Sequence, residues 1–227
     1  MDGEDETGEE AVMTLPDGYS DEANALWRAA QALNRASGAV SLPPLLFFTD
    51  PERTPRPWGT AARLPAGAGV VFRAFGRPDA LDTGRRLREA TRAAGVRLLV
   101  GRDADLAEAI GADGVHLPET SADGIRVARR RPDWIVTVAW HGELEPSQEA
   151  DALILSPVFP AGGASSARPA LGVEAFTDKI NAASRPVYAL GGIDASAALE
   201  LAVTGACGIA GVEAIQAAFG AAPSVRT

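Results

Sequence analysis

The sequence contains few of the residues on which common catalytic and metal-binding motifs depend. One cysteine, Cys207, cannot form an internal disulfide, and with two histidines it cannot complete a Cys/His metal motif. Lys179 is the only lysine and lies in a predicted outer helix, which argues against an aldolase that forms an imine. No serine occupies the nucleophile-elbow motif of hydrolases. These absences exclude several common enzyme classes.

Long hydrophobic runs and a basic N-terminus are also absent. No apolar run approaches the ~20 residues that a membrane span requires, and the acidic N-terminus is unlike a signal peptide. A single cysteine suits a reducing compartment. We therefore expect a cytoplasmic protein that has no membrane partner.

Basic residues are missing from the start of the chain, where the first of them is Arg28. Nine of the 30 acidic residues precede it, which leaves 21 acidic against 21 basic residues in the rest of the chain. The net charge of −9 therefore belongs to the N-terminus, and residues 1–20 are predicted to be an acidic, disordered tail. The neutral remainder argues against a nucleic-acid partner, because binding a phosphate backbone requires a basic patch.

The rest of the chain alternates between helical and strand patterns. Apolar residues at helical spacing predict an N-terminal helix over 21–38. From residue 43 to residue 220, short apolar runs alternate with amphipathic segments, the weakest of which is a predicted helix at 143–150. The predicted strands are Leu45–Thr49, Gly69–Ala74, Val96–Val100, Asp113–Leu117, Trp134–Ala139, Ala152–Leu155, Pro186–Leu190 and Cys207–Ala210.

Eight strand–helix units joined by short loops predict parallel strands with helical crossovers. A doubly wound open sheet would give the same alternation. The count of eight and the missing Gly-x-Gly-x-x-Gly turn after the first strand favour a closed barrel. The predicted fold is therefore an α/β protein, a (β/α)8 TIM barrel at 43–220 that follows an extra N-terminal helix and an acidic tail.

Such a barrel carries its functional groups at the carboxyl ends of its strands. Imidazole changes charge near neutral pH, so His141 is a candidate proton carrier, whereas His116 could point into a packed layer. The alternative, that polar residues end these strands without a functional role, stays open. The candidates that follow strands one to six are Thr49, Asp50, Arg73, Arg102, Asp103, His116, Glu119, His141 and Ser156.

Glycines after the last two strands predict a phosphate site. Gly191, Gly192 and Ile193 join the seventh strand to a helix, where glycine lets the backbone approach a ligand and amides attract a phosphate. Gly211 and Val212 follow the eighth strand. The next residue, Glu213, would repel a phosphate unless it points away. The long loop that begins at Ser156 and contains Arg168 reads either as a lid over this site or as a connector.

Five segments resemble the motifs of one family, the thiamine phosphate synthases and their TenI-type relatives. The resemblance covers about residues 45–216 in consistent order. The segments are LLFFTD at 45–50, LAEAIGADGVHL at 106–117, SPVFP at 156–160, LG at 171–172 and LGGI at 190–193.

This resemblance implies a TIM barrel that binds a phosphorylated small molecule. Synthases couple hydroxymethylpyrimidine diphosphate to thiazole phosphate and release pyrophosphate with the help of Mg²⁺, and some TenI-type proteins tautomerise the thiazole phosphate. Catalytic roles would fall on His141, Arg73 and Arg102. The phosphate or substrate would meet Gly191, Gly192, Ile193, Gly211, Val212, Ser156 and Arg168.

The chain departs from the family pattern where magnesium and diphosphate would bind. The two expected aspartates fall on Arg102 and Ser121, which leaves Asp103 and Glu119 as candidate metal ligands. The expected serine of the last phosphate loop falls on Glu213. Three hypotheses stay open: a synthase, a TenI-type tautomerase that uses His141, and a non-catalytic barrel that binds a thiamine precursor or regulates the pathway. A homo-oligomer is a further open expectation.

Overall fold

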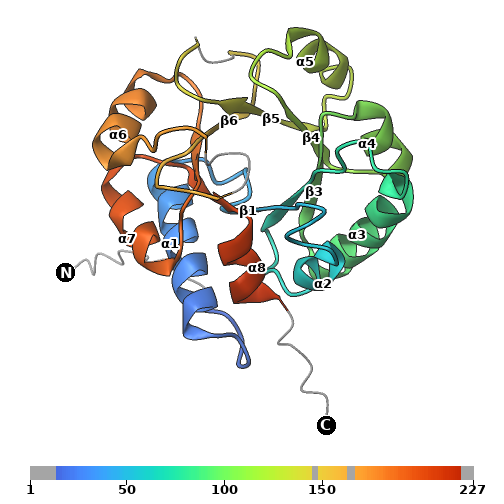
Figure 1. The fold of residues 1–227 in the computed structure, drawn as a ribbon, viewed down its shortest axis with the longest axis horizontal. Helices are drawn as coiled ribbons and strands as arrows, with labels where there is room; N and C mark the ends of the chain where they lie inside the picture. The colour runs from blue at the N-terminus through green and yellow to red at the C-terminus, as the bar shows by residue number, and fades with distance from the viewer. Residues whose placement is uncertain (1–13, 145–147, 163–166, 221–227) are drawn as a thin grey trace, which may run out of the picture.

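The computed structural model describes residues 14–144, 148–162 and 167–220, and these contain a closed barrel of eight parallel strands in sequential order (Figure 1). β1 pairs with β2 on one side and with β8 on the other, which closes the cylinder. The closed barrel confirms the (β/α)8 fold and excludes the open sheet. The strands are β1 Leu45–Phe48, β2 Gly69–Phe72, β3 Arg97–Gly101, β4 Gly114–Leu117, β5 Ile135–Trp140, β6 Ala152–Leu155, β7 Val187–Leu190 and β8 Gly208–Gly211.

Helices surround this cylinder, as Figure 1 shows. Gly95 and Gly111 end α3 and α4 in the left-handed conformation, with φ of +66° and +64°, which glycine adopts without strain. The helices are α1 Asp21–Ala36, α2 Pro57–Ala61, α3 Ala80–Ala94, α4 Ala104–Ile110, α5 Ala122–Ala128, α6 Gly172–Ala182, α7 Ala195–Glu200 with a 3₁₀ turn at Leu201–Val203, and α8 Glu213–Phe219.

Two features of this ring differ from the sequence prediction. The weak helix expected at 143–150 is wrong in its described part, where residues 143, 144 and 148–150 form bends; residues 145–147 lie outside the described residues. A short helix that was not predicted, α2, follows β1. Proline at the start of α2 is compatible with a helix because the first amides of a helix have no intrahelical acceptor.

Alternate side chains of the strands fill the inside of the barrel. Leu46 and Phe48 of β1 pack there, whereas Phe47 between them packs outward against the helices. Tyr188, fully buried in the interior, donates its hydroxyl hydrogen to the carbonyl oxygen of Pro43 at 2.6 Å. The interior is therefore packed, and ligands have access only to its ends.

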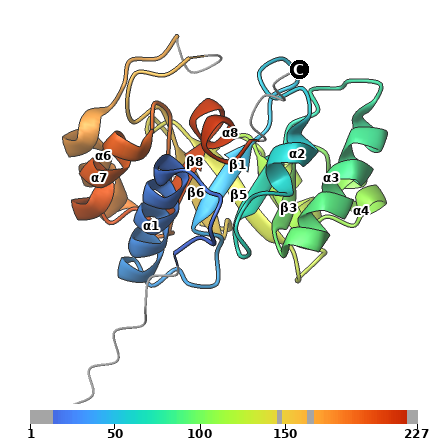
Figure 2. The ribbon, with the colours of Figure 1, turned by 90° about the horizontal axis from the view of Figure 1, so that it is seen from below.

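The predicted N-terminal helix is present as α1, which packs beside α7 and α8 (Figure 2). Ser20 caps it, because its hydroxyl oxygen accepts a hydrogen bond from the amide of Ala23 at 3.1 Å. Leu26, Trp27 and Leu33 bury its apolar face. The predicted acidic tail falls largely on residues 1–13, which lie outside the described residues, so its disorder stays a prediction.

Asn34 ties this helix to the barrel. Its side-chain nitrogen is buried and donates to the carbonyl oxygens of Ala39, Leu42 and Cys207 at 2.9, 3.2 and 3.2 Å. Asn34→Ala would remove these three hydrogen bonds, although the carbonyl oxygen of Ala39 would still accept from the amide of Leu42 at 2.9 Å, so the free energy of unfolding is expected to fall by about 1–3 kcal/mol in a denaturant titration. The exposed Asn181 of α6 provides a control, Asn181→Ala, and equal losses in the two variants would contradict the prediction.

None of the described helices combines the length and the apolar character that crossing a membrane requires.

Candidate functional site

The carboxyl ends of the eight strands form one rim, because all neighbouring strands are parallel. The sequence candidates that end or follow these strands therefore share this rim. They do not share one cavity. The structure brings some of them together at the ends of β7, β8 and β1, places a second group at β4 and β5, and leaves others exposed.

One cavity, called the main cavity here because it contains the glycine loops expected to bind phosphate, has a volume of about 330 Å³ and opens at the ends of β7, β8 and β1. It brings together all five glycine-loop positions expected to bind phosphate: Gly191, Gly192, Ile193, Gly211 and Val212. Arg73 joins them from the position just after β2, and Arg53, which was not among the sequence candidates, joins them from the loop after β1. The cavity therefore places two guanidinium groups opposite two backbone loops.

The loop after β7 has room only for glycine. Gly192 has φ of +67°, and a Cβ atom there would lie 2.5 Å from the carbonyl oxygen of Pro160 and 2.8 Å from the Cβ of Phe159. The amides of Gly192, Ile193 and Val212 have no backbone acceptor in the described part of the chain. Amides of this kind, at the wall of a cavity, can donate to an anion.

One part of the expected phosphate site is wrong. The first amides of α7 were expected to be free for a phosphate, but Asp194 caps this helix. Its carboxylate accepts hydrogen bonds from the amides of Ser196 and Ala197, both at 2.9 Å. A side-chain cap already satisfies these donors, so these two amides are not free for an anion, whereas those of the glycine loops are.

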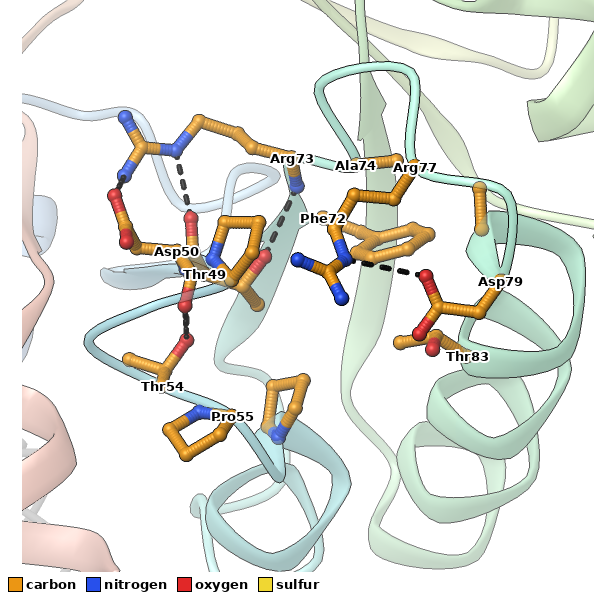
Figure 3. Close-up of a pocket in the computed structure, with 13 residues that line it drawn as sticks. Thr49, Asp50, Thr54, Pro55, Phe72, Arg73, Ala74, Arg77, Asp79 and Thr83 are labelled. Carbon is orange, nitrogen blue, oxygen red and sulfur yellow. Dashed lines mark hydrogen bonds and ion pairs between the residues drawn. The ribbon is translucent and has the colours of Figure 1, made fainter.

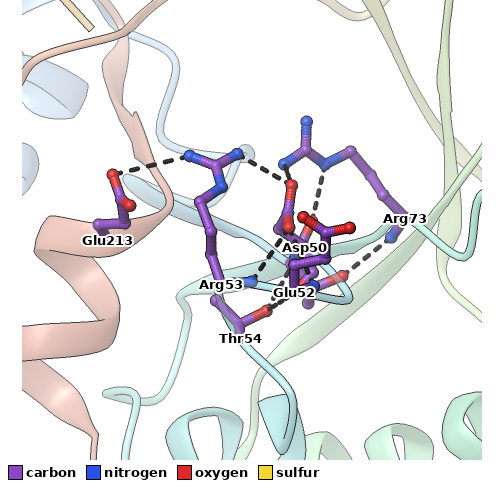
Figure 4. A network of polar contacts seen from close by, with 7 residues as sticks. Asp50, Glu52, Arg53, Thr54, Arg73 and Glu213 are labelled. Atoms are coloured by element: carbon purple, nitrogen blue, oxygen red, sulfur yellow. Dashed lines mark hydrogen bonds and ion pairs between the residues drawn. The ribbon is translucent and has the colours of Figure 1, made fainter. Parts of the chain in front are cut away.

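A chain of charges crosses the mouth of this cavity (Figure 4). Asp50 accepts from Arg53 Nη2 at 2.9 Å and lies 3.7 Å from Arg73 Nη2, while Arg53 Nη1 lies 3.6 Å from Glu213 Oε2. Burial alone would raise the pKa of Asp50, but hydrogen bonds from Arg53 and from the amide of Glu52 outweigh it and hold the pKa below its ordinary value. Asp50 is therefore a carboxylate that holds both arginines in place.

Thr49 fixes Arg73 through two hydrogen bonds, which Figure 3 shows. The carbonyl oxygen of Thr49 accepts from Arg73 Nε at 2.7 Å, and its hydroxyl oxygen accepts from the Arg73 amide at 3.0 Å. The guanidinium lies over the rings of Phe48 and Phe75, 5.5 and 5.3 Å from their centroids. Thr49, Arg73 and Arg77 also line a smaller hollow of about 140 Å³ beside α3.

Arg73 has an unused donor. Burial lowers the pKa of its guanidinium to about 10; the charge of Asp50 raises this pKa, and the charge of Arg53 lowers it further. The guanidinium is therefore still charged at neutral pH. Its buried Nη2 has no hydrogen-bond acceptor among the described residues. A buried donor without an acceptor is costly, and an anionic ligand in the neighbouring cavity would supply one.

A histidine–carboxylate pair occupies the rim at β4 and β5. Glu119 accepts from the His141 amide at 3.0 Å and lies 2.8 Å from His141 Nδ1. Lys179 donates to the carbonyl oxygen of Gly142 at 2.7 Å and so holds the chain just after the histidine. A carboxylate at Nδ1 favours the tautomer with hydrogen on that nitrogen, which leaves Nε2 as the proton acceptor.

The remaining sequence candidates have other environments. Arg102 is exposed, with φ of +69°, and Arg168 is exposed in the loop after β6. Ser156 is buried, and its amide donates to the carbonyl oxygen of Trp140. None of these three residues lines the main cavity.

The candidate magnesium ligands do not fit that role. Asp103 is exposed and caps α4, accepting from the amide of Leu106 at 2.8 Å, and both oxygens of Glu119 bind His141. Across the described ranges, no three His, Cys, Asp or Glu side chains gather closely enough to hold a metal ion. These donors are therefore committed to protein contacts.

His116 is a core residue of the barrel interior. It is 9% exposed, lies with Nδ1 3.0 Å from the hydroxyl oxygen of Thr137, and meets Phe48 edge-on. Burial, with a smaller contribution from Arg73, lowers its pKa to about 3. The interpretation of His116 as a packed residue, rather than a proton carrier, fits this environment better.

The burial of His116 predicts a pH dependence of stability. The unfolded chain binds a proton at this residue below pH ~6.5, whereas the folded chain does so only near pH 3. The contribution of His116 to the free energy of unfolding is therefore fully present above pH ~6.5 and is lost as the pH falls. The free energy of unfolding should fall by about 1.4 kcal/mol per pH unit between pH 6 and pH 4. Denaturant titrations should show this slope in the wild type and a shallower one in His116→Gln, and parallel curves would refute it.

The comparisons with known proteins agree with this architecture. Residues 59–215 match the family model described as thiamine monophosphate synthase. A thiamine-phosphate synthase from Geobacillus kaustophilus is 34% identical over 186 residues, which cover 76% of this chain and 84% of that protein. Another, from Archaeoglobus fulgidus, is 34% identical over 139 residues, 60% of this chain and 66% of its own length. The structure of a thiamine phosphate pyrophosphorylase from Pyrococcus furiosus superposes with a TM-score of 0.64 at 28% identity, covering 77% of this chain and 91% of that one. The chain thus belongs to the thiamine monophosphate synthase family.

Proposed function

We propose that this protein joins thiazole phosphate to hydroxymethylpyrimidine diphosphate, the reaction of a thiamine-phosphate synthase. One observation carries the proposal: the glycine loops after β7 and β8 and the guanidiniums of Arg53 and Arg73 line the same cavity. Backbone amides and arginines are the donors that phosphate groups require. The name of the curated relatives supports the choice of substrates.

The reaction would use these groups to bind and neutralise phosphates. The phosphate of the thiazole would meet the amides of Gly192 and Ile193. As the thiazole nitrogen bonds to the pyrimidine methylene carbon, the bond from that carbon to the diphosphate oxygen breaks and pyrophosphate leaves. Arg73, with its unused Nη2 donor, would stabilise the charge that gathers on the departing group.

An assay with both substrates and magnesium in the buffer tests the proposal. The wild type should form thiamine phosphate, and Arg73→Ala should form none that can be measured. Arg77→Ala is the matched control, because Arg77 is an exposed arginine on the same loop that lies outside the main cavity. The absence of product at high enzyme concentration would eliminate the synthase function.

A thermal-shift titration tests the non-catalytic alternative. A ligand present at 100 times its dissociation constant stabilises the folded state by about 2.7 kcal/mol. If the chain binds thiazole phosphate and makes no product, it is a binding protein. If neither precursor shifts the melting temperature, it binds no thiamine precursor.

The histidine–carboxylate pair favours a second candidate, a TenI-type tautomerase. Glu119 orients His141 through two contacts, and Nε2 is the ring nitrogen that would exchange a proton with a substrate. This reaction needs one phosphorylated thiazole and no diphosphate. It therefore does not depend on magnesium ligands at positions 102 and 121, where this chain has arginine and serine.

A further inference from the structure

Arg53 and Glu213 face each other across the mouth of the main cavity. Arg53 comes from the loop after β1 and Glu213 begins α8, and the two strands that precede them are hydrogen-bonded neighbours. Their closest atoms, Nη1 and Oε2, lie 3.6 Å apart. Figure 4 shows this contact as the end of the chain of charges that starts at Arg73.

The two ends of this contact are held very differently. The Arg53 side chain is 22% exposed and is anchored by Asp50, which accepts from its Nη2 at 2.9 Å and from its amide at 3.1 Å. The Glu213 side chain is 64% exposed. An ion pair at 3.6 Å with one exposed partner is weak, so a stronger acceptor can take its place.

A phosphate in the cavity would be such an acceptor. It carries more charge than a carboxylate, and arginine binds phosphate through shorter, charge-assisted hydrogen bonds. The same phosphate would be repelled by Glu213, which lines the cavity beside Val212. Binding therefore requires Arg53 to turn from the carboxylate to the ligand.

We propose that Arg53 and Glu213 form a counter-ion pair that sets the affinity of this chain for phosphate groups. Arg53 exchanges its contact with Glu213 for a contact with the phosphate, and Glu213 lowers the affinity for the ligand. This assignment rests on the proposed phosphate site, and it goes beyond it by naming the two side chains that control the strength of binding.

Titration with inorganic phosphate, followed by calorimetry at neutral pH, tests the pair. Arg53→Ala should weaken binding about tenfold or more, because a charge-assisted hydrogen bond is lost. Arg53→Lys should restore part of the affinity. Glu213→Gln should tighten binding several-fold, and its gain should be larger in the Arg53→Ala background, where no cation faces the carboxylate.

Two neighbours on the same loop provide controls for charge. Arg56 and Glu52 are exposed and lie outside the cavity lining, so Arg56→Ala and Glu52→Gln should leave the affinity within twofold of the wild type. If Arg53→Ala and Glu213→Gln behave as these controls do, the counter-ion pair is refuted while the phosphate site stands. If the wild type binds no phosphate, the site and the pair are refuted together.

Discussion

Gly192→Ala is expected to weaken the binding of thiazole phosphate by about 100-fold. The new Cβ atom would lie 2.5 Å from the backbone oxygen of Pro160, and backbone cannot move aside as a flexible side chain can. The loop after β7 must therefore shift away from the segment after β6. Such a shift moves the amides of Gly192 and Ile193, and a misplacement of about 1 Å at a binding site can cost this much.

Gly67→Ala separates this effect from backbone strain. Gly67 also has a positive φ, +87°, so alanine there is strained in a comparable way, but no atom lies within 4 Å of the place that its Cβ would take. Gly67→Ala should lose thermal stability through strain alone, and Gly192→Ala should lose more because it adds the clash with the backbone of Pro160. Only Gly192→Ala should lose affinity in a calorimetric titration, and equal affinities would show that the loop after β7 does not contact the ligand.

The sequence predicted the barrel because burial leaves a simple pattern along the chain. Each strand is buried on both faces, so it reads as a short apolar run such as Leu45–Phe48, and glycine marks the helix ends at Gly95 and Gly111. Two local segments, the helix α2 that was not predicted and the helix at 143–150 that was predicted wrongly, gave no such signal. α2 has only five residues, and the sequence at 143–150 has few apolar residues and contains Pro146, which disfavours a helix that continues through it.

For the site, the sequence predicted the residues at the strand ends but not the residues in the loops beyond them. The rule that functional groups lie at the carboxyl ends of barrel strands placed Arg73, Gly192 and Val212 on the rim, and all three line the main cavity. It overlooked Arg53, whose position depends on the turn that Asp50 forms with the two residues after Pro51. An aspartate followed by proline signals such an Asx-type turn, but it does not tell which way the next side chain points.

Glu119 shows a different limit of the sequence. A carboxylate near the expected magnesium site reads as a metal ligand, because the sequence gives its type and its place on the rim but not its partner. The partner is decided by the register of β4 against β5, which brings the end of one strand beside His141 at the end of the other. Metal ligand and histidine partner are therefore alternatives that only the packed structure separates.

For the second candidate function, the tautomerase, His141→Ala is expected to lower the rate of proton exchange on thiazole phosphate by about 10²–10⁴-fold, the usual contribution of a positioned acid or base. The affinity for the ligand should not change, because His141 lies outside the main cavity, where the phosphate is proposed to bind. Deuterium exchange into the thiazole, followed by NMR, measures the rate, and calorimetry measures the affinity. Full activity in this variant would make His141 a structural residue.

Glu119 contacts His141, so we expect its loss to lower the rate of proton exchange and to leave the affinity for the ligand unchanged. Glu119→Gln keeps the shape of the side chain but removes the negative charge that faces Nδ1, and kcat for exchange should fall about tenfold while KM stays the same. Glu143→Gln, which removes an exposed charge two residues beyond His141, should change neither value. A rise in KM with kcat unchanged would instead place Glu119 in direct contact with the ligand, because a group that binds ground state and transition state equally affects KM alone.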